Sequence, residues 1–195
     1  ASDVYKRQQQ LTVFPEGQIT GRLMTNAGRT RSFGGEASLL ATLWRNLDLQ
    51  VAYGYTRATF VKFDTGKADY AGNFIPYAPQ HTLYAGASYT LRTGWNWLEY
   101  VIFRVAANGA GRIYWNEANT FSQPFYALLE ASIRFEHRHW AVDVWGRNLT
   151  DTRYDTFYFM SIGNSFLQRG RPRTFGVSLS ITLSVSYTHL RAHET

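Results

Sequence analysis

The chain has 195 residues, of which 17% are charged and 16% aromatic, and it carries a net charge of +6. Its longest unbroken apolar run, residues 125–129, is far shorter than the ~18 residues of a membrane-spanning helix, so helical membrane spans are excluded. The absence of cysteine excludes disulfide scaffolds, thiolate metal sites and cysteine nucleophiles.

Apolar and polar residues alternate with a period of two, which predicts an all-β chain. Several of the alternating segments exceed the roughly 5 or 6 residues of globular strands and reach the ~9 to 11 residues that cross a bilayer. The alternation predicts eight antiparallel strands, in chain order at residues 9–14, 23–44, 47–62, 80–92, 97–115, 124–137, 139–154 and 171–183.

The connections between these strands alternate in length. Tight turns are expected at residues 45–46, 93–96 and 137–139, and long polar loops at 63–79, 116–123 and 155–170. Outer-membrane barrels have short periplasmic turns and long extracellular loops. Strand length and this asymmetry together favour a transmembrane β-barrel over a soluble β-sandwich.

Aromatic residues gather where the two membrane surfaces are expected. Those at or beside the tight turns are Trp44, Trp95, Trp97 and Trp140. Those expected to form the opposite girdle are Tyr55, Phe60, Tyr114, Trp115 and Tyr154.

The two faces of the strands are assigned by the free energy of placing charge in lipid. A basic side chain that faces lipid near the bilayer midplane costs about 2–4 kcal/mol, so the polar phase is expected to face a wet lumen and the apolar phase the lipid. A soluble sandwich would show the same alternation with the faces exchanged. The residues expected to line the lumen are Arg104, Asn108, Arg112, Glu130, Arg134, Asp143 and Arg147.

Four segments resemble, in the right order, parts of the TonB-dependent outer-membrane receptors. Residues 148–154, NLTDTRY, followed by GRPR at 170–173 and an alternating strand, look like the C-terminal signature of that family. Residues 9–14, 26–36 and 76–89 are similar to three earlier parts of the family's barrel. By the resemblance, the structural motif consists of Asn148, Leu149, Asp151, Tyr154, Gly170, Pro172 and Arg173.

The resemblance implies an outer-membrane barrel of about 22 strands whose lumen is filled by an N-terminal plug. Residues 9–183 are then expected to be the C-terminal portion of that barrel, while residues 1–8 and 184–195 lack the alternation and are interpreted as a non-native leader and tail. The implied function is active uptake of a scarce large ligand, most often an iron-siderophore chelate. By the resemblance, lumen arginines suit an anionic chelate, and the aromatic loops at 73–79 and 154–166 are candidates for ligand contact.

The resemblance also implies the partners of the complete receptor. They are the TonB energy-coupling complex, reached through a part of the receptor outside this chain, the barrel-assembly machinery and outer-membrane lipid. The complete receptor is expected to be a monomer. Nucleic-acid binding is not expected, because the positive charges are dispersed apart from RGRPR at 169–173, which is interpreted as the entry to a strand.

No motif in the chain indicates catalysis. It has neither a nucleophile elbow nor a dinucleotide-binding glycine pattern, so we expect no enzyme activity and no cofactor. His137 and His139 are interpreted as solvated turn residues rather than metal ligands. Asn148 begins a glycosylation sequon that is interpreted as a strand-end turn, with its side chain and that of Asp151 bonding nearby backbone amides.

Two other architectures remain compatible with the alternation. One is a complete small eight-stranded outer-membrane barrel with a structural or adhesion role, which the strand count supports and the family-like segments do not. The other is a soluble all-β binding domain or enzyme, which would bury the apolar phase between two sheets and fold without detergent.

Overall fold

The computed structural model describes residues 10–13, 23–26, 28–161 and 164–183. None of these residues belongs to a helix that is long and apolar enough to cross a membrane. The segments 1–8 and 184–195, interpreted above as non-native, lie outside the described residues.

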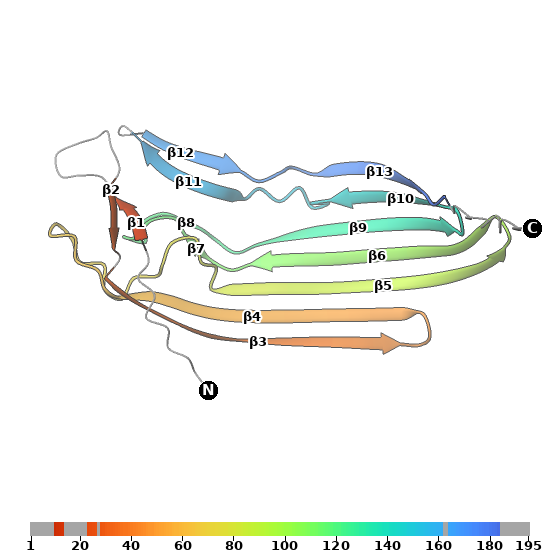
Figure 1. Cartoon of the computed structure of the whole chain (residues 1–195), viewed down its shortest axis with the longest axis horizontal. Helices are drawn as coiled ribbons and strands as arrows, with labels where there is room; N and C mark the ends of the chain where they lie inside the picture. The colour runs from red at the N-terminus through yellow and green to blue at the C-terminus, as the bar shows by residue number, and fades with distance from the viewer. Residues whose placement is uncertain (1–9, 14–22, 27, 162–163, 184–195) are drawn as a thin grey trace, which may run out of the picture.

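One antiparallel sheet of seven strands makes up most of the structure (Figure 1). Its spatial order is β13-β10-β9-β6-β5-β4-β3. In chain order the strands are β3 Arg29–Leu43, β4 Leu47–Lys62, β5 His81–Trp95, β6 Leu98–Ala110, β9 Tyr126–His137, β10 Trp140–Arg147 and β13 Thr174–Ile181. The five strands β3, β4, β5, β6 and β9 have 12 to 16 residues, which suffices to cross a bilayer at a tilt.

Three short hairpins lie at one end of this sheet, opposite the tight turns that join β3 to β4, β5 to β6 and β9 to β10 (Figure 1). They pair β1 Gln10–Val13 with β2 Leu23–Asn26, β7 Ile113–Tyr114 with β8 Ser122–Gln123, and β11 Asp155–Ser161 with β12 Asn164–Arg169. The predicted asymmetry between tight turns and long connections is therefore confirmed. We call the two ends of the sheet the turn end and the loop end.

Most strand bounds follow the predicted ones, and the departures have local backbone causes. β4 has the predicted bounds, 47–62. The predicted strand 23–44 is interrupted near Gly28, whose φ is +31° and where a Cβ would lie 1.9 Å from the carbonyl oxygen of Lys62. The predicted strand 139–154 ends at Arg147, because the next residue, Asn148, has a φ of +50° and turns the chain away.

The long connection predicted at residues 155–170 is present, and most of its residues are in strands. They form the hairpin β11–β12, in which Phe159 lies opposite Phe166. An alternation of apolar and polar residues is missing here because both faces of β11 are aromatic. Tyr158 is 4% exposed and packs with Ile113 and Trp115, while its neighbour Phe157 is 42% exposed.

The apolar phase of the seven-stranded sheet is exposed. Leu39, Val105 and Val177 keep 65%, 45% and 68% of their surface accessible, and no second sheet of the described residues covers them. The edge strands β3 and β13 do not pair with each other in the described residues, so the sheet is open. The structure is therefore neither a β-sandwich nor a closed eight-stranded barrel, and the exposed face has the character of a lipid-facing surface.

The two predicted aromatic girdles have different outcomes. At the turn end, Trp44, Trp95 and Trp97 are 82%, 56% and 62% exposed, as an interfacial girdle requires. At the loop end, Phe60 and Trp115 are 1% and 6% exposed. The prediction that these two residues face the membrane surface was wrong, because they form small cores beneath the loops.

Candidate functional site

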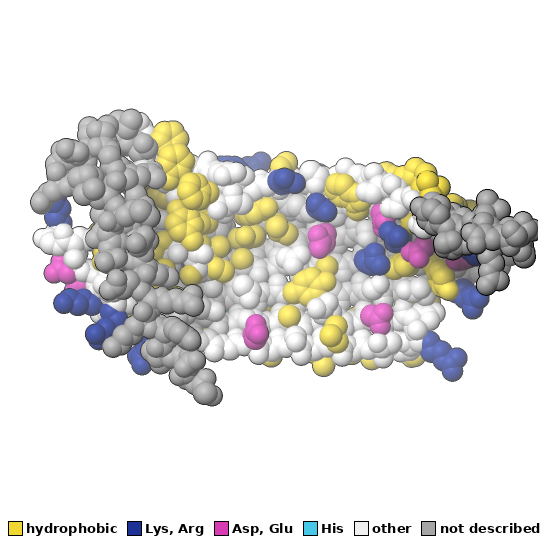
Figure 2. Space-filling view, in the orientation of Figure 1, with side chains coloured by type: hydrophobic (Ala, Val, Ile, Leu, Met, Phe, Trp, Pro, Cys, Tyr) yellow, Lys and Arg dark blue, Asp and Glu magenta, His cyan; other side chains and the backbone are white. Residues whose placement is uncertain are grey.

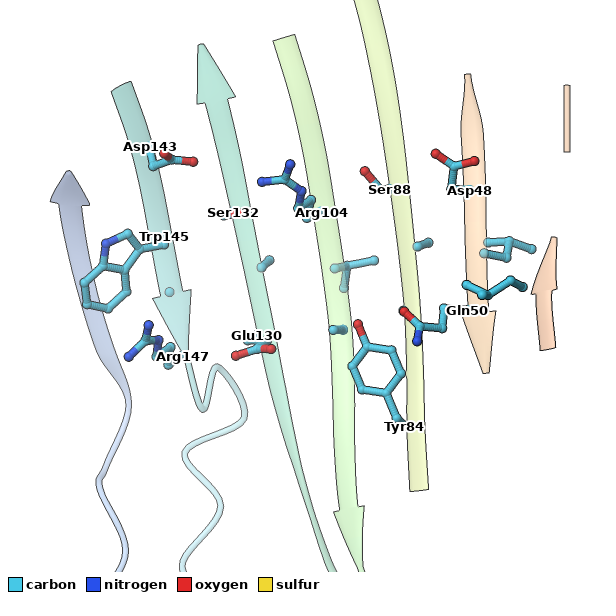
Figure 3. Close-up of a pocket in the computed structure, with 18 of the residues that line it drawn as sticks. Asp48, Gln50, Tyr84, Ser88, Arg104, Glu130, Ser132, Asp143, Trp145 and Arg147 are labelled. Atoms are coloured by element: carbon cyan, nitrogen blue, oxygen red, sulfur yellow. The ribbon is translucent and has the colours of Figure 1, made fainter. Parts of the chain in front are cut away.

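A cavity of about 550 Å³ lies on the polar face of the sheet (Figure 3). We call it the polar cavity. Strands β4, β5, β6, β9, β10 and β13 contribute its polar and aromatic lining. The side chains labelled in Figure 3 are Asp48, Gln50, Tyr84, Ser88, Arg104, Glu130, Ser132, Asp143, Trp145 and Arg147.

Strand register brings these side chains together. Arg104 lies opposite Ser88 of β5 and Ser132 of β9. Asp143 of β10 lies opposite Arg134 of β9. Because directly paired residues of neighbouring strands project to the same side of a sheet, the polar phase forms one continuous face.

Near the turn end, three charged side chains of this face form an ion triad. Arg134 donates from Nε to Glu136 Oε2 at 2.8 Å and from Nη1 to Asp143 Oδ2 at 2.6 Å. The three side chains are between 20% and 38% exposed, so water screens the ion triad only in part. Its single positive charge is therefore committed to two carboxylates and is not available to an anionic ligand.

Two other arginines of the polar cavity are available. The guanidinium carbon of Arg147 lies 4.8 Å from the ring centre of Trp145, whose indole N–H donates to Ser178 Oγ at 3.2 Å. This cation–π contact holds the guanidinium without neutralising its charge. Arg104 makes no ion pair with another residue that the structure describes. Arg104 and Arg147 are thus the guanidinium groups of the polar cavity that form no ion pair in the described residues, and the carboxylates of Asp48 and Glu130 line the same cavity.

The remaining predicted lumen residues differ in their placement. Asn108 lies closer to the loop end than Glu130 and reaches it at 3.4 Å, from Nδ2 to Oε1. Arg112 does not join the polar face. β6 ends at Ala110, and beyond it side chains no longer alternate between the two faces of the sheet. Arg112 instead lines a separate groove together with residues of the apolar face such as Leu83.

The family-like motif builds a junction between β10 and β13, made of residues 148–154 and 170–173. Asn148 is 5% exposed and stands at its centre. Its Nδ2 donates to the carbonyl oxygens of Thr152 and Arg171 at 3.0 and 3.1 Å, and its Oδ1 accepts from the Thr152 N–H at 2.9 Å. One side chain thus ties the two segments of the junction together.

Other residues of the motif close the same junction. Asp151 Oδ1 accepts from the backbone N–H of Arg173 at 3.0 Å, and the Leu149 N–H donates to the carbonyl oxygen of Leu129 at 2.8 Å. Pro172, with its fixed φ, precedes the donating amide. The prediction that the side chains of Asn148 and Asp151 bond backbone amides in a strand-end turn is confirmed.

Tyr154 and Gly170 complete the junction by close approach. The Gly170 N–H donates to the Tyr154 carbonyl oxygen at 2.8 Å, and a Cβ on Gly170 would lie 2.0 Å from the Tyr154 ring. The Tyr154 ring also stacks on Tyr126 of β9, with ring centres 4.6 Å apart. Only glycine leaves room for this ring, which explains the spacing of the motif.

At the loop end, two loops that are far apart in the sequence pack together. The Tyr77 hydroxyl donates to the Tyr158 carbonyl oxygen at 2.6 Å, and the Tyr77 ring stacks on Phe157 at 5.7 Å. Phe157 continues to Phe159 at 5.8 Å, and Phe159 to Phe166 at 4.9 Å. We call Tyr77, Phe157, Phe159 and Phe166 the aromatic ladder.

The aromatic ladder is accessible, since its four side chains are 37% to 47% exposed. Figure 2 shows hydrophobic side chains gathered near β11 and β12 on the same face as the charged side chains of the sheet. An exposed row of stacked rings can bind flat or apolar groups of a ligand. The loop end therefore combines an aromatic surface with a charged cavity farther along the same face.

Tyr84 and Trp145 also belong to the polar cavity and were not among the predicted site residues. The charge-based face assignment selected ionised and amide side chains, so aromatic residues on the polar phase were passed over. Their position in the alternation was the available signal. Tyr84 lies opposite Asn108, and Trp145 lies opposite Ser132.

A family model and a curated protein both match this chain to receptors. The family model described as TonB dependent receptor-like, β-barrel matches residues 3–149. Among curated proteins, the pesticin receptor of Yersinia pestis is 25% identical over 171 residues, which cover 85% of this chain and 24% of that protein.

Solved structures agree with this match in fold. The ferric yersiniabactin uptake receptor FyuA from Yersinia pestis aligns with a TM-score of 0.71 and 23% identity over 82% of this chain and 24% of that one. BauA, the ferric preacinetobactin receptor from Acinetobacter baumannii, aligns with a TM-score of 0.64 and 19% identity over 88% of this chain and 25% of that one. The chain spans about a quarter of the length of these relatives.

Proposed function

The chain belongs to the TonB-dependent receptors of the bacterial outer membrane, and we propose that it forms the C-terminal portion of the barrel of a receptor that takes up a ferric siderophore. The curated relative is a pesticin receptor, and the two solved structures are receptors for ferric yersiniabactin and ferric preacinetobactin. The matched relatives supply the class of cargo. The described residues supply the chemistry that would receive it.

The observation that carries the proposal is the aromatic ladder placed at the loop end of the polar face. Siderophores that chelate iron through aryl hydroxyl groups present flat rings, which stack on exposed aromatic side chains. Tyr77 and Phe157 belong to different loops and are fixed against each other by the hydrogen bond from Tyr77 to Tyr158. The ladder is therefore pre-organised, which lowers the entropic cost of binding.

The polar cavity supports the second step of uptake. A ferric chelate with a negative net charge would be attracted by the guanidinium groups of Arg104 and Arg147, neither of which forms an ion pair in the described residues. Transport needs binding and release without a chemical change of the ligand, so we propose no catalytic role for these residues.

Uptake against a gradient requires parts of the receptor other than these strands. We propose that an N-terminal plug fills the lumen of the complete barrel, couples to the TonB complex, and contacts the polar face described here. Insertion by the barrel-assembly machinery and a monomeric state in outer-membrane lipid complete the proposal. In-frame coding DNA upstream of residue 9 would then encode several hundred further residues, including the plug.

Binding by the complete receptor tests the proposed cargo. Purified receptor is titrated with ferric catecholate, phenolate and hydroxamate chelates while its tryptophan fluorescence is followed. The double variant Phe157→Ala, Phe159→Ala removes two stacking partners and should weaken binding of an aryl chelate by about 10-fold. The matched control is Phe33→Ala, because Phe33 is 53% exposed and lies on the apolar face.

Two results would contradict the proposal. One is the absence of binding to every ferric chelate tested, together with normal iron uptake by an iron-starved strain that lacks the receptor. The other is equal loss of binding in the ladder variant and in Phe33→Ala, which would indicate a general folding defect rather than ligand contact.

A further inference from the structure

An apolar cleft of about 470 Å³ lies at the turn end of the apolar face. We call it the tryptophan cleft. Trp95 and Trp97 form one side and stack with ring centres 5.3 Å apart, and Trp140 of β10 also lines it. Leu98 and Val101 are 4% and 9% exposed and form a buried floor.

The tryptophan cleft spans two hairpins. The β5–β6 turn carries Trp95 and Trp97, and the β9–β10 turn precedes Trp140. These hairpins are neighbours because β6 pairs with β9, and both turns lie at the same end of the sheet (Figure 1). An aromatic girdle on a flat surface would leave no hollow between the hairpins.

In a membrane, the group that suits an apolar cleft of this kind is a lipid acyl chain. The surface that lines the tryptophan cleft is entirely apolar, so water would find no hydrogen-bond partner there. An unfilled cleft would lose the dispersion contacts of its walls. An acyl chain supplies those contacts, and Trp95 and Trp97 are 56% and 62% exposed and therefore open to it.

The turn beside the tryptophan cleft is basic. It contains His137, Arg138 and His139, and Arg138 and His139 are exposed. The His137 ring stacks on Trp140 with centres 5.9 Å apart and lies 5.7 Å from the His139 ring. Arg138 forms no ion pair with another residue that the structure describes. The turn that leads into Trp140 of the tryptophan cleft thus carries the positive charge of Arg138.

We propose that the tryptophan cleft binds an anionic glycerophospholipid of the periplasmic leaflet. One acyl chain lies between the tryptophans, and the phosphate is bound by Arg138 with His137 and His139 beside it. The planar guanidinium group matches phosphate in charge and geometry. Tight turns are periplasmic in this class of barrel, and tryptophan rings sit at the level of the headgroups. The proposal is independent of the cargo that the receptor carries.

Photo-crosslinking of the complete receptor in nanodiscs tests the proposal. The probes are phosphatidylglycerol and phosphatidylcholine with a diazirine in one acyl chain, and labelled peptides are mapped by mass spectrometry. Phosphatidylglycerol should label residues 95–101 and 135–142 about five-fold more than the turn at Trp44, the preference expected for one basic side chain near an anionic headgroup.

Three variants distinguish the binding of the acyl chain from the binding of the headgroup. Arg138→Gln should lower phosphatidylglycerol labelling of the tryptophan cleft to the phosphatidylcholine level. Trp140→Ala should lower labelling by both lipids, and the control Trp44→Ala should change neither, because Trp44 is 82% exposed and lies outside the cleft. Heat-modifiable migration on gels verifies that each barrel is folded. If Trp140→Ala does not fold, Arg138→Gln in its exposed turn still decides the test.

Uniform labelling of all three tight turns would overturn the proposal, because it would show ordinary boundary lipid. Equal labelling by the two lipids, unchanged in Arg138→Gln, would also overturn it, because the basic turn would then recognise no phosphate charge. Neither result bears on siderophore binding, which is measured separately in detergent.

Discussion

Replacing Asn148 tests whether one buried amide holds the junction between β10 and β13. Its side chain makes three hydrogen bonds, with the backbone of Thr152 and Arg171. Each neutral hydrogen bond contributes about 1 kcal/mol, so Asn148→Gly should destabilise the junction by about 3 kcal/mol. Asn148→Ala should cost about 1 kcal/mol more, because the residue has a φ of +50° and a Cβ disfavours the left-handed region.

Limited trypsin digestion of the complete receptor measures this loss locally, because Arg147 and Arg153 flank the turn of the junction. When opening is fast relative to cleavage, the cleavage rate follows the population of the open form. A loss of about 3 kcal/mol corresponds to roughly 140-fold faster cleavage in Asn148→Gly, and about 4 kcal/mol to roughly 700-fold in Asn148→Ala. Thr150→Ala is the control, since its hydroxyl bonds only in the exposed part of the same turn.

Two outcomes would refute this reasoning. Equal rates for the glycine and alanine variants would show that the positive φ of Asn148 carries no strain. Rates within about threefold of the unchanged receptor for both variants would show that packing, rather than the amide, holds the junction.

Four further substitutions probe the two faces of the sheet. Val105→Arg places charge on the apolar face and should lower folding stability in lipid by about 2–4 kcal/mol, whereas Ala106→Arg on the polar face should be nearly neutral; the folded fraction in liposomes distinguishes them. Gly176→Ala would put a Cβ 2.3 Å from the Trp145 ring and should cost about 1–3 kcal/mol, measured as a shift in the urea midpoint. Arg134→Gln leaves two carboxylates of the ion triad unpaired and should cost about 1–2 kcal/mol, a loss that shrinks in high salt.

The strands and the two faces of the sheet could be predicted from the sequence because one physical constraint acts on every strand. Charged side chains are unfavourable at lipid-facing positions, so the polar residues of neighbouring strands must all lie on the other face of the sheet. Register then placed Asp143 opposite Arg134, and their ion pair follows from an alternation that was visible in the sequence. This constraint acts only within a strand, where side chains alternate between the two faces. Arg112 lies beyond the end of β6, so the alternation did not predict its position.

The loop end could not be predicted because its contacts join residues that are far apart in the sequence. Asn119 illustrates this, since its side chain accepts from the Phe74 N–H at 2.7 Å and donates to the Phe74 carbonyl oxygen at 2.9 Å. Nothing local to either residue indicates that partner. The burial of Phe60 and Trp115 has the same origin, because an aromatic residue near a strand end has the same sequence signal in a girdle and under a loop.

The charges of the polar face are arranged in a way that bears on directional transport. From the loop end inward, a ligand would meet the uncharged aromatic ladder and then, near the middle of the sheet, the two guanidinium groups of Arg104 and Arg147 with the one carboxylate of Glu130. Near the turn end it would meet the ion triad, in which one positive and two negative charges leave a negative excess. For an anionic chelate, the two guanidinium groups near the middle would therefore be attractive, and the ion triad near the tight turns would be repulsive. Such a profile favours capture from outside and weak binding at the point of release, as uptake requires.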